Sequence, residues 1–275
     1  MEVRDARLPL CSACAHVEPH LKDRKRLIIL NKCDLIEPRE QHDWAAHFAK
    51  LGQAIEYVNA VKGTRISQLL PPALIQRGLV PSRDERSILI MIVGLPNTGK
   101  SSVINAMRKK GWLSSHRGAS SHIAKVGAVP GITRAVTTIQ FYNNPPSFLI
   151  DTPGLNMTGR IDSDLGVKLS MIGTVKEDLV DPCILAEHVL NLLNEKSQLE
   201  YVKKYGLSGT ITDTGELLTM IAMKYGCLQK SASIQRGESN PAVKLLNPDM
   251  EKAAHFFIQH FRAGELGRFV MDALP

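Results

Sequence analysis

The chain has 275 residues, of which 44% are hydrophobic and 22% charged, and its formal net charge at pH 7 is +7. This length can bury one α/β domain together with a smaller companion. No apolar stretch approaches the roughly 18 residues that a membrane-spanning helix requires. The five scattered cysteines argue against a disulfide framework and favour a reducing compartment.

The first informative element is an apolar strand at residues 26–30, which ends in the segment Asn31-Lys32-Cys33-Asp34. This segment fits NKxD, the motif with which GTPases read a guanine base. The alternative is an ordinary junction between a strand and a turn, because Asn and Asp favour turns by themselves. A second strand at 55–58 ends in Asn59-Ala60, where GTPases carry the loop whose N–H meets guanine O6. Taken alone, this dipeptide fits a simple strand end equally well.

The most specific motif follows the next apolar strand. Residues 88–93 form an uninterrupted apolar run, which predicts a strand buried on both faces. Gly94 to Ser101 then fit GxxxxGK[ST], and residues 101–109 are expected to form the helix behind this loop. Such a P-loop directs backbone N–H groups and a helix N-terminus at phosphate oxygens.

A fourth strand at residues 147–150 leads into Asp151-Thr152-Pro153-Gly154, which fits DxxG. Between the P-loop and this motif, a Pro-Gly-Ile-Thr segment makes Thr133 our choice for the threonine of the first switch loop. Thr137 and Thr138 compete for that role. The Pro-Gly pair favours a mobile loop at Thr133, whereas the β-branched run after it favours a strand.

The order of these motifs predicts the fold. The carboxyl ends of parallel strands meet at one edge of a sheet, so we expect NKxD, the P-loop and DxxG to converge on one crevice. An ordinary GTPase carries NKxD last, whereas this chain carries it first. The sequence therefore predicts a circularly permuted P-loop GTPase domain over residues 1–175, with a Rossmann-like, mostly parallel α/β sheet.

The P-loop and DxxG motifs predict how phosphate and metal are bound. We expect Lys100 to bridge the β- and γ-phosphates of GTP and the Ser101 hydroxyl to bind Mg²⁺. Thr133 would complete the Mg²⁺ shell, Asp151 would act from its outer coordination shell, and the Gly154 N–H would sense the γ-phosphate. Lys100, Thr133 and Gly154 are thus the expected catalytic residues. The other phosphate-loop residues expected to contact GTP or GDP are Asn97, Thr98, Gly99 and Ser102.

The NKxD motif predicts how the base is recognised. Asp34 would accept hydrogen bonds from guanine N1 and its 2-amino group, a paired contact that adenine cannot reproduce. Asn31 and Lys32 would brace this loop. The remaining residues expected on the base side are Cys33, Asn59 and Ala60.

The group that positions the attacking water is not evident. Ras-like GTPases use a glutamine directly after DxxG, but this chain has Leu155 there. An apolar side chain cannot position water, so the hydrolytic machinery must come from another segment, a monovalent cation or a partner. Asn97 is a candidate K⁺ ligand, and an Asn that merely stabilises a turn is the equally weighted alternative.

The positive charge is concentrated in the first part of the chain. Residues 1–170 contain 23 Lys and Arg residues and 14 Asp and Glu residues, whereas residues 171–275 contain 11 Lys and Arg and 13 Asp and Glu. Residues 103–150 contain no carboxylate at all, which is typical of a surface that binds a polyanion such as RNA. A solvated basic face is the alternative. The positive groups of this segment are Arg108, Lys109, Lys110, Arg117, Lys125 and Arg134, with His116 and His122 beside them.

Residues 176–275 are predicted to form a small α-helical domain. Apolar residues between positions 250 and 261 recur at the spacing of an amphipathic helix. Residues 184–194 and 216–225 are expected to be helical as well, with breakers at Asp181-Pro182 and Ser208-Gly209.

Together, these motifs resemble those of the YlqF/RbgA-type permuted GTPases, and the similarity covers essentially the whole chain. It extends to the tail Phe261-Arg262-Ala263-Gly264-Glu265-Leu266-Gly267 and to the opening Glu2-Val3-Arg4-Asp5-Ala6-Arg7-Leu8-Pro9. The resemblance implies GTP hydrolysis coupled to late assembly of the large ribosomal subunit, with that subunit and its rRNA as partners. For mitochondrial members it further implies a mitochondrial location, in the matrix or peripherally on the inner membrane, and a monomeric protein.

One departure from the family affects the expected site. Members of the family carry an additional N-terminal segment with a Pro-Gly-His stretch and the first strand of the GTPase domain. This chain opens directly at Met1-Glu2-Val3 without that segment, so we expect an N-terminal truncation that removes this strand. Its first residues also do not read as an import presequence, an observation that says nothing about import if the truncation is real. Such a truncation, together with Leu155, keeps open an alternative function, a nucleotide-gated RNA-binding or ribosome-binding module with little intrinsic GTPase activity.

Overall fold

The computed structural model resolves the chain into two compact units, one formed by residues 1–176 and 269–275 and the other by residues 177–268. Each unit is described by itself. The structure describes residues 1–14, 20, 24–80, 87–115, 137–152, 163–175, 180–230 and 246–275.

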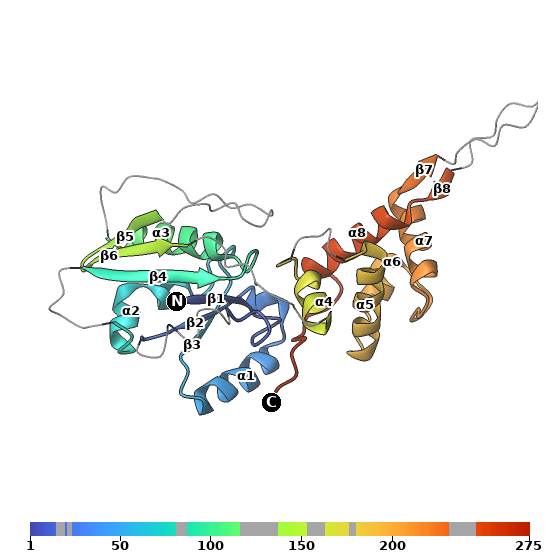
Figure 1. The fold of residues 1–275 in the computed structure, drawn as a ribbon. Coiled ribbons are helices and arrows are strands. Elements are labelled where there is room, and N and C mark those ends of the chain that lie inside the picture. Colours follow the sequence, from blue (N-terminus) through green and yellow to red (C-terminus); the bar gives the residue numbers. More distant parts are fainter. Residues whose placement is uncertain are drawn as a thin grey trace, which may run out of the picture. The chain divides into compact units, whose positions relative to one another are not determined.

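The first unit is built on a six-stranded sheet with the order β3-β2-β1-β4-β6-β5 (Figure 1). All neighbouring strands are parallel except β5, which runs antiparallel to β6. This mostly parallel α/β sheet confirms the predicted fold class. The strands are β1 (Glu2–Asp5), β2 (Ile28–Asn31), β3 (Ile55–Val58), β4 (Ile88–Gly94), β5 (Thr137–Asn143) and β6 (Pro146–Asp151), and the helices are α1 (Pro38–Lys50), α2 (Pro71–Gln76), α3 (Lys100–Ser115) and α4 (Ser163–Met171).

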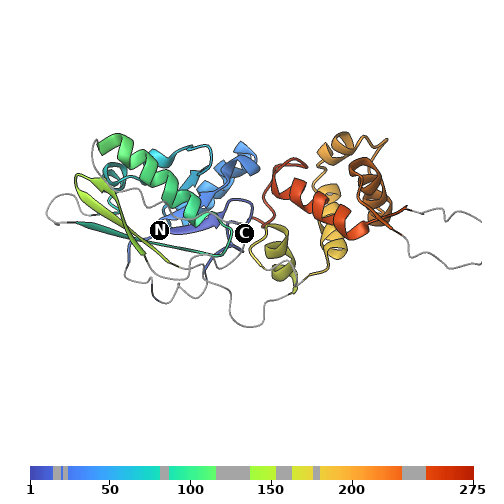
Figure 2. The same ribbon diagram turned by 90° about the horizontal axis from the view of Figure 1, so that it is seen from above.

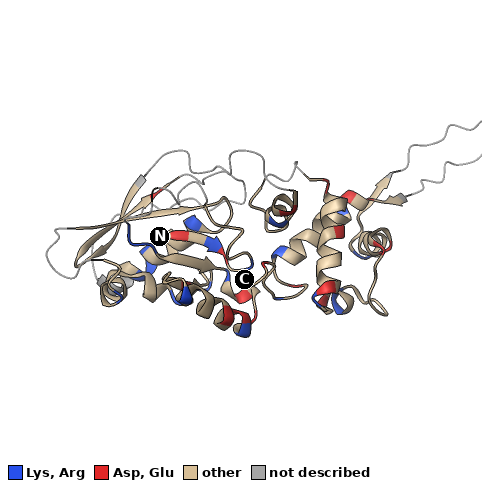
Figure 3. Cartoon of the chain, turned by 60° about the horizontal axis from the view of Figure 1, so that its bottom comes forward, with Lys and Arg blue, Asp and Glu red and all other residues tan. Residues whose placement is uncertain are grey.

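The expectation that the first strand would be missing is wrong. Residues Glu2–Asp5 form β1, which lies in the interior of the sheet and pairs with β2 on one side and with β4 on the other. Acidic and basic residues share this short strand (Figure 3). Its charged side chains are nevertheless buried, because each has a partner of opposite charge. The Arg4 guanidinium donates to both carboxylate oxygens of Glu2, at 3.0 Å each, and Asp5 pairs with Arg7 and Lys32.

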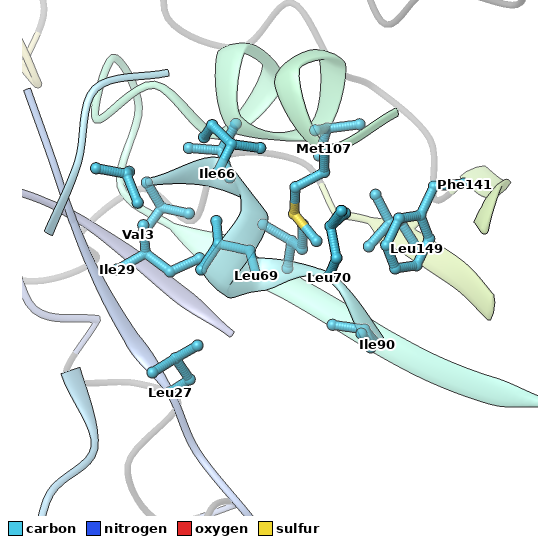
Figure 4. Packing of buried hydrophobic residues seen from close by; sticks show 14 of the residues in the cluster. Val3, Leu27, Ile29, Ile66, Leu69, Leu70, Ile90, Met107, Phe141 and Leu149 are labelled. Carbon is cyan, nitrogen blue, oxygen red and sulfur yellow. The ribbon is translucent and has the colours of Figure 1, made fainter. Parts of the chain in front are cut away.

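Two apolar clusters cover opposite faces of the sheet. Alternate side chains of a strand point to opposite faces, and on β2 Ile29 enters one cluster while Ile28 and Leu30 enter the other. The first cluster joins the strands to Met107 of α3 (Figure 4). The second includes Trp44 of α1. The parallel strands are thus held between helices, as the positions of α3 and α1 in Figure 1 also show.

The strand that leads to the P-loop departs from its prediction. The apolar run of β4 was expected to be buried on both faces, but in its first half only one face is buried, and Val93 is the buried residue of the other face. Ile88, Ile90 and Ile92 are buried in the cluster under α3. In the part of the chain that the structure describes, Leu89 is 63% exposed and Met91 52% exposed.

The second unit is helical, and the three predicted helices are confirmed (Figure 2). Three of its helices begin at an Asp whose carboxylate accepts backbone N–H groups of the first turn, which satisfies donors that have no partner within the helix. The caps are Asp181, Asp213 and Asp249. The unit contains α5 (Pro182–Glu195), α6 (Glu200–Tyr205), α7 (Thr214–Tyr225), α8 (Met250–Arg262) and the hairpin of β7 (Leu228–Lys230) and β8 (Leu246–Pro248).

The C-terminal tail does not follow the predicted division at 176–275, because residues 269–275 belong to the first unit. Hydrogen bonds from the tail to the first residues of the chain explain the difference. The Met271 N–H donates to the Arg7 carbonyl at 2.8 Å, and the Asp272 carboxylate accepts from the N–H groups of Leu10 and Cys11 at 2.7 and 3.0 Å. Among the described residues, no helix is both long and apolar enough to cross a bilayer.

Candidate nucleotide-binding site

The P-loop spans the turn between the end of β4 and the start of α3. The Thr98 hydroxyl donates to the Leu95 carbonyl at 2.9 Å, and the Val103 N–H donates to the Gly99 carbonyl, which starts the helix. Gly99 has φ +96°, and a Cβ there would lie 2.2 Å from Nδ2 of Asn31. This glycine is therefore required both by the backbone conformation and by the neighbouring loop.

Lys100 folds back over this loop. Its ammonium donates to the carbonyl oxygens of Gly94 and Leu95 at 3.1 and 3.2 Å, and the side chain is buried. Burial lowers the pKa of Lys100, and the nearby Asp151 carboxylate partly opposes this shift. A buried ammonium group folded over this loop is well suited to bind a negatively charged phosphate group.

Asn31, the first residue of NKxD, bonds to two other loops. Its amide nitrogen donates to the Thr98 carbonyl at 2.9 Å, and its amide oxygen accepts from the Ala60 N–H at 3.1 Å. The structure thereby brings together the NKxD segment, the P-loop and the loop after β3. The sequence led us to expect that NKxD and the P-loop would meet at the carboxyl ends of parallel strands, and these contacts join the two.

Lys32 makes a second connection to the P-loop. Its ammonium lies 3.0 Å from the carbonyl oxygen of Asn97 and 2.8 Å from Oδ2 of Asp5. The Asn97 side chain in turn donates to the carbonyl of Gly173 at 2.6 Å. Asp5 had no predicted role in the site, because its strand was thought to be absent; the signal that could have revealed it is its place at a strand end, like Asn31 and Asp151.

The base side of the site contains the half-buried carboxylate of Asp34. It lies 3.0 Å from the ammonium of Lys62, which was not predicted to belong to the site. The Lys62 N–H is held by the Asn59 side chain at 2.8 Å. Cys33 and Asp34 lie in a short 3₁₀ helix directly after β2, so the backbone sets the position of this carboxylate.

Asp151 ends β6 beside the P-loop, with its carboxylate buried. Within the described residues its Oδ1 has no hydrogen-bond partner. Burial raises the pKa of Asp151, and the positive charge of Lys100 opposes this shift. A buried carboxylate oxygen without a partner fits Mg²⁺, a hard cation that prefers oxygen ligands, and Ser101 offers a hydroxyl in the first turn of α3.

Several predicted residues lie outside the described part of the chain: Thr133, Gly154, Leu155 and the basic residues Arg117, Lys125 and Arg134, with His116 and His122. The two competitors for the switch threonine are placed by the structure. Thr137 and Thr138 belong to β5, where they pair with Asp151 and Ile150 of β6.

The chain is similar to known GTPases over most of its length. A family model described as "50S ribosome-binding GTPase" matches residues 89–214. The Mitochondrial ribosome-associated GTPase 1 of Xenopus tropicalis is 37% identical, and the match covers 99% of this chain and 86% of that protein. The Ribosome biogenesis GTPase A of Bacillus pumilus (strain SAFR-032) is 30% identical, with coverages of 85% and 80%.

A solved structure shares the fold. The GNP-bound structure of YlqF from T. maritima matches with a TM-score of 0.61 and 22% identity, covering 98% of this chain and 90% of that one. At this identity the match bears on the fold alone, and it agrees with the permuted strand order.

Proposed function

Because this chain belongs to the family of permuted GTPases that includes mitochondrial ribosome-associated GTPase 1 and ribosome biogenesis GTPase A, we propose that it hydrolyses GTP to time its binding to an assembling mitochondrial large ribosomal subunit. The observation that carries this proposal is the convergence of three loops. Asn31 ends β2, Lys100 begins α3 after the loop that follows β4, and Asp151 ends β6, so all three lie at the carboxyl ends of parallel strands.

The phosphates of GTP or GDP would lie over the P-loop. Lys100 would release the carbonyls of Gly94 and Leu95 to bind the β- and γ-phosphates. Ser101, Asp151 and Thr133 would hold Mg²⁺, which neutralises phosphate charge when bound. The Gly154 N–H would contact the γ-phosphate, and the other P-loop residues assigned to the nucleotide are Asn97, Thr98, Gly99 and Ser102.

Guanine would lie against Asp34, displacing the Lys62 ammonium from the carboxylate. Guanine presents two hydrogen-bond donors to Asp34. Its binding would therefore replace the exposed Lys62–Asp34 ion pair, which contributes little to stability, by two hydrogen bonds to a carboxylate. The Ala60 N–H is fixed by Asn31, which supports a contact to guanine O6. Cys33 and Asn59 complete the proposed base-side surface.

Hydrolysis needs a group that orients the attacking water. Leu155 cannot supply it, so we propose low intrinsic turnover that rises on the ribosomal subunit. Asn97 remains a proposed K⁺ ligand. Its amide nitrogen donates to the Gly173 carbonyl, and a cation would bind the amide oxygen, which is the acceptor atom of this side chain.

The rRNA of the subunit is the proposed polyanion partner. The basic stretch after the P-loop supports this assignment, and its described part lies on α3, with Arg108, Lys109 and Lys110. The second candidate, a nucleotide-gated binder with little turnover, is favoured by Leu155.

The location of the protein is proposed from its relatives, whose names are mitochondrial. We propose a monomer in the matrix that contacts the inner membrane peripherally. Carbonate extraction of mitochondria and light scattering of the purified protein test these two points: resistance to carbonate contradicts peripheral contact, and a dimer mass contradicts the monomer.

The deciding experiment is GTP hydrolysis with Mg²⁺, in K⁺ and in Na⁺, with and without purified mitochondrial large subunits. Stimulation by subunits that is lost in Lys100→Ala, but kept in the control Lys50→Ala at an exposed position at the end of α1, supports a ribosome-activated GTPase. Tight GTP binding without stimulated turnover supports the nucleotide-gated binder. A preference for K⁺ over Na⁺ supports the role of Asn97, and equal rates contradict it.

A further inference from the structure

We infer that Asp5 is a positioning residue for guanine recognition: its carboxylate holds Lys32 against the P-loop and thereby fixes the loop that presents Asp34. This inference rests on the proposed binding of guanine nucleotides. Asp5 touches no nucleotide in this scheme, so its effect would pass entirely through Lys32.

The Asp5 carboxylate is the meeting point of two cations. It is 0% exposed at the end of β1. The Arg7 guanidinium donates to its two oxygens at 3.0 and 2.9 Å, the Arg7 N–H donates to Oδ1 at 3.1 Å, and the Lys32 ammonium donates to Oδ2 at 2.8 Å. These positive donors outweigh burial and hold the pKa of Asp5 well below its usual range. Asp5 therefore stays ionised near neutral pH and remains paired with Lys32.

Lys32 occupies a backbone conformation that needs support. Its φ of 60° and ψ of 37° lie in the left-handed region, which a residue with a side chain rarely adopts. The peptide turned in this way starts the 3₁₀ helix Cys33–Leu35, whose second residue is Asp34. Anchoring the Lys32 ammonium between Asp5 and the Asn97 carbonyl therefore fixes the direction in which this helix leaves β2.

The same lysine joins base recognition to phosphate binding. Because Lys32 contacts Asn97 of the P-loop at 3.0 Å, the guanine-reading carboxylate and the phosphate loop are tied through one side chain. Losing Asp5 would leave Lys32 with one fewer anchor, and the Asp34 carboxylate would sample more positions. A contact that needs two simultaneous hydrogen bonds is more sensitive to such freedom than the contacts to phosphate.

The chain supplies a matched control on the same strand. Glu2 is 1% exposed and is held by Arg4, two residues further on, just as Asp5 is held by Arg7. Its further partners are Arg26 and the Cys14 N–H, which belong to none of the nucleotide motifs. Glu2→Gln and Asp5→Asn thus disturb comparable buried ion pairs, but only Asp5 contacts Lys32.

The test compares the affinities for GTP and for inosine triphosphate, which lacks the 2-amino group that Asp34 would bind. A loss of folded protein weakens both affinities equally, so the ratio of the two Kd values reports the position of Asp34 alone. We expect Asp5→Asn to lower the inosine-to-guanine Kd ratio at least threefold. Glu2→Gln should lower the melting temperature but leave the ratio of Kd values within about twofold of the wild type. Mutations at independent sites usually change each other's effects by no more than about this factor.

A third variant keeps the inference testable if Asp5→Asn does not fold. Lys32→Gln breaks the contact with Asp5 and retains the Asp5–Arg7 pair, and we expect the same fall in the ratio. The double variant should add no further fall. An unchanged ratio in Lys32→Gln or Asp5→Asn, or an equal fall in Glu2→Gln, overturns the inference. If the wild-type protein itself does not prefer GTP, the proposed function fails instead, which is a separate result.

Discussion

The side-chain amide of Asn31 donates a 2.9 Å hydrogen bond to the backbone carbonyl of Thr98, which joins the base-reading loop to the phosphate loop. The same side chain accepts from the Ala60 N–H at 3.1 Å. A single buried amide therefore sets the spacing of three loops that come from different parts of the chain. The nucleotide site depends on this spacing because guanine and the phosphates must be bound simultaneously.

We expect Asn31→Ala to weaken GTP binding at least tenfold and to lower the free energy of unfolding by about 1–3 kcal/mol, because it leaves a buried donor and a buried acceptor without a partner. Isothermal titration and urea unfolding measure the two effects. Asn194 is the control: it similarly bridges the Ile211 carbonyl and the Tyr201 hydroxyl within the helical unit. Asn194→Ala should lower stability with GTP affinity unchanged, and equal affinities for the two variants would refute the role of Asn31.

Gly99→Ala should abolish GTP binding. An added Cβ would lie 2.2 Å from Nδ2 of Asn31, and the residue would keep the unfavourable φ of +96°. Gly78→Ala separates these causes, since Gly78 has φ +66° with nothing within 4 Å of the added Cβ. It should cost about 1 kcal/mol of stability through backbone strain alone. Nucleotide binding by both variants, measured with a fluorescent GTP analogue, decides the matter; normal binding by Gly99→Ala would exclude the proposed crowding.

Several strands of the sheet were predicted from the sequence, whereas the interior strand β1 was missed. The strands before Asn31, Gly94 and Asp151 were predictable, because each is an apolar run that ends in a recognisable motif. The interior strand β1 was not, because Glu2, Arg4 and Asp5 give it the hydropathy of a loop. These charges are tolerated inside the sheet because Glu2 pairs with Arg4 and Arg26, and Asp5 pairs with Arg7 and Lys32. Sequence patterns do not show which charged residues will meet in this way.

The tail and the far face of β4 were missed for a related reason. Residues 269–275 have no periodic pattern, and their place in the first unit comes from hydrogen bonds such as that from the Val270 N–H to Glu40 at 2.9 Å. An apolar run alone does not distinguish a strand covered on two faces from one covered on a single face, so the exposure of Leu89 and Met91 needed the structure.

Asp272→Ala should release the tail from the first unit. The Asp272 carboxylate accepts from the N–H groups of Leu10 and Cys11, and its loss leaves these donors to water or without a partner. We expect stability to fall by about 1–3 kcal/mol, with faster hydrogen exchange at Leu10 and Cys11. As a control, Asp249→Ala removes a helix cap in the other unit and should leave exchange at Leu10 unchanged. Unaltered exchange in Asp272→Ala would show that the tail is held by other contacts.

The raised pKa of Asp151 gives the nucleotide-free protein a pH dependence of known sign. A carboxyl group whose pKa is higher in the folded protein than in the unfolded chain binds its proton more tightly when folded. The stability that it contributes is therefore lost as the pH rises from the usual value of 3.8 through the raised one. Above that range, the folded protein holds an ionised, buried carboxylate whose Oδ1 has no hydrogen-bond partner among the described residues, which lowers its stability. Mg²⁺ bound with the nucleotide would offset this loss of stability.

Asp151→Asn tests this account. Without metal, we expect its melting temperature to depend less on pH than that of the wild type as the pH rises above the usual carboxyl value of 3.8. At pH 7.5 it should exceed that of the wild type. With GTP and Mg²⁺, the wild type should be stabilised and the variant much less so. Differential scanning calorimetry gives both quantities. Asp164→Asn serves as control, because Asp164 forms an exposed pair with Lys168 in α4. Full stabilisation of Asp151→Asn by Mg²⁺ and GTP would contradict a role for this carboxylate in holding the metal.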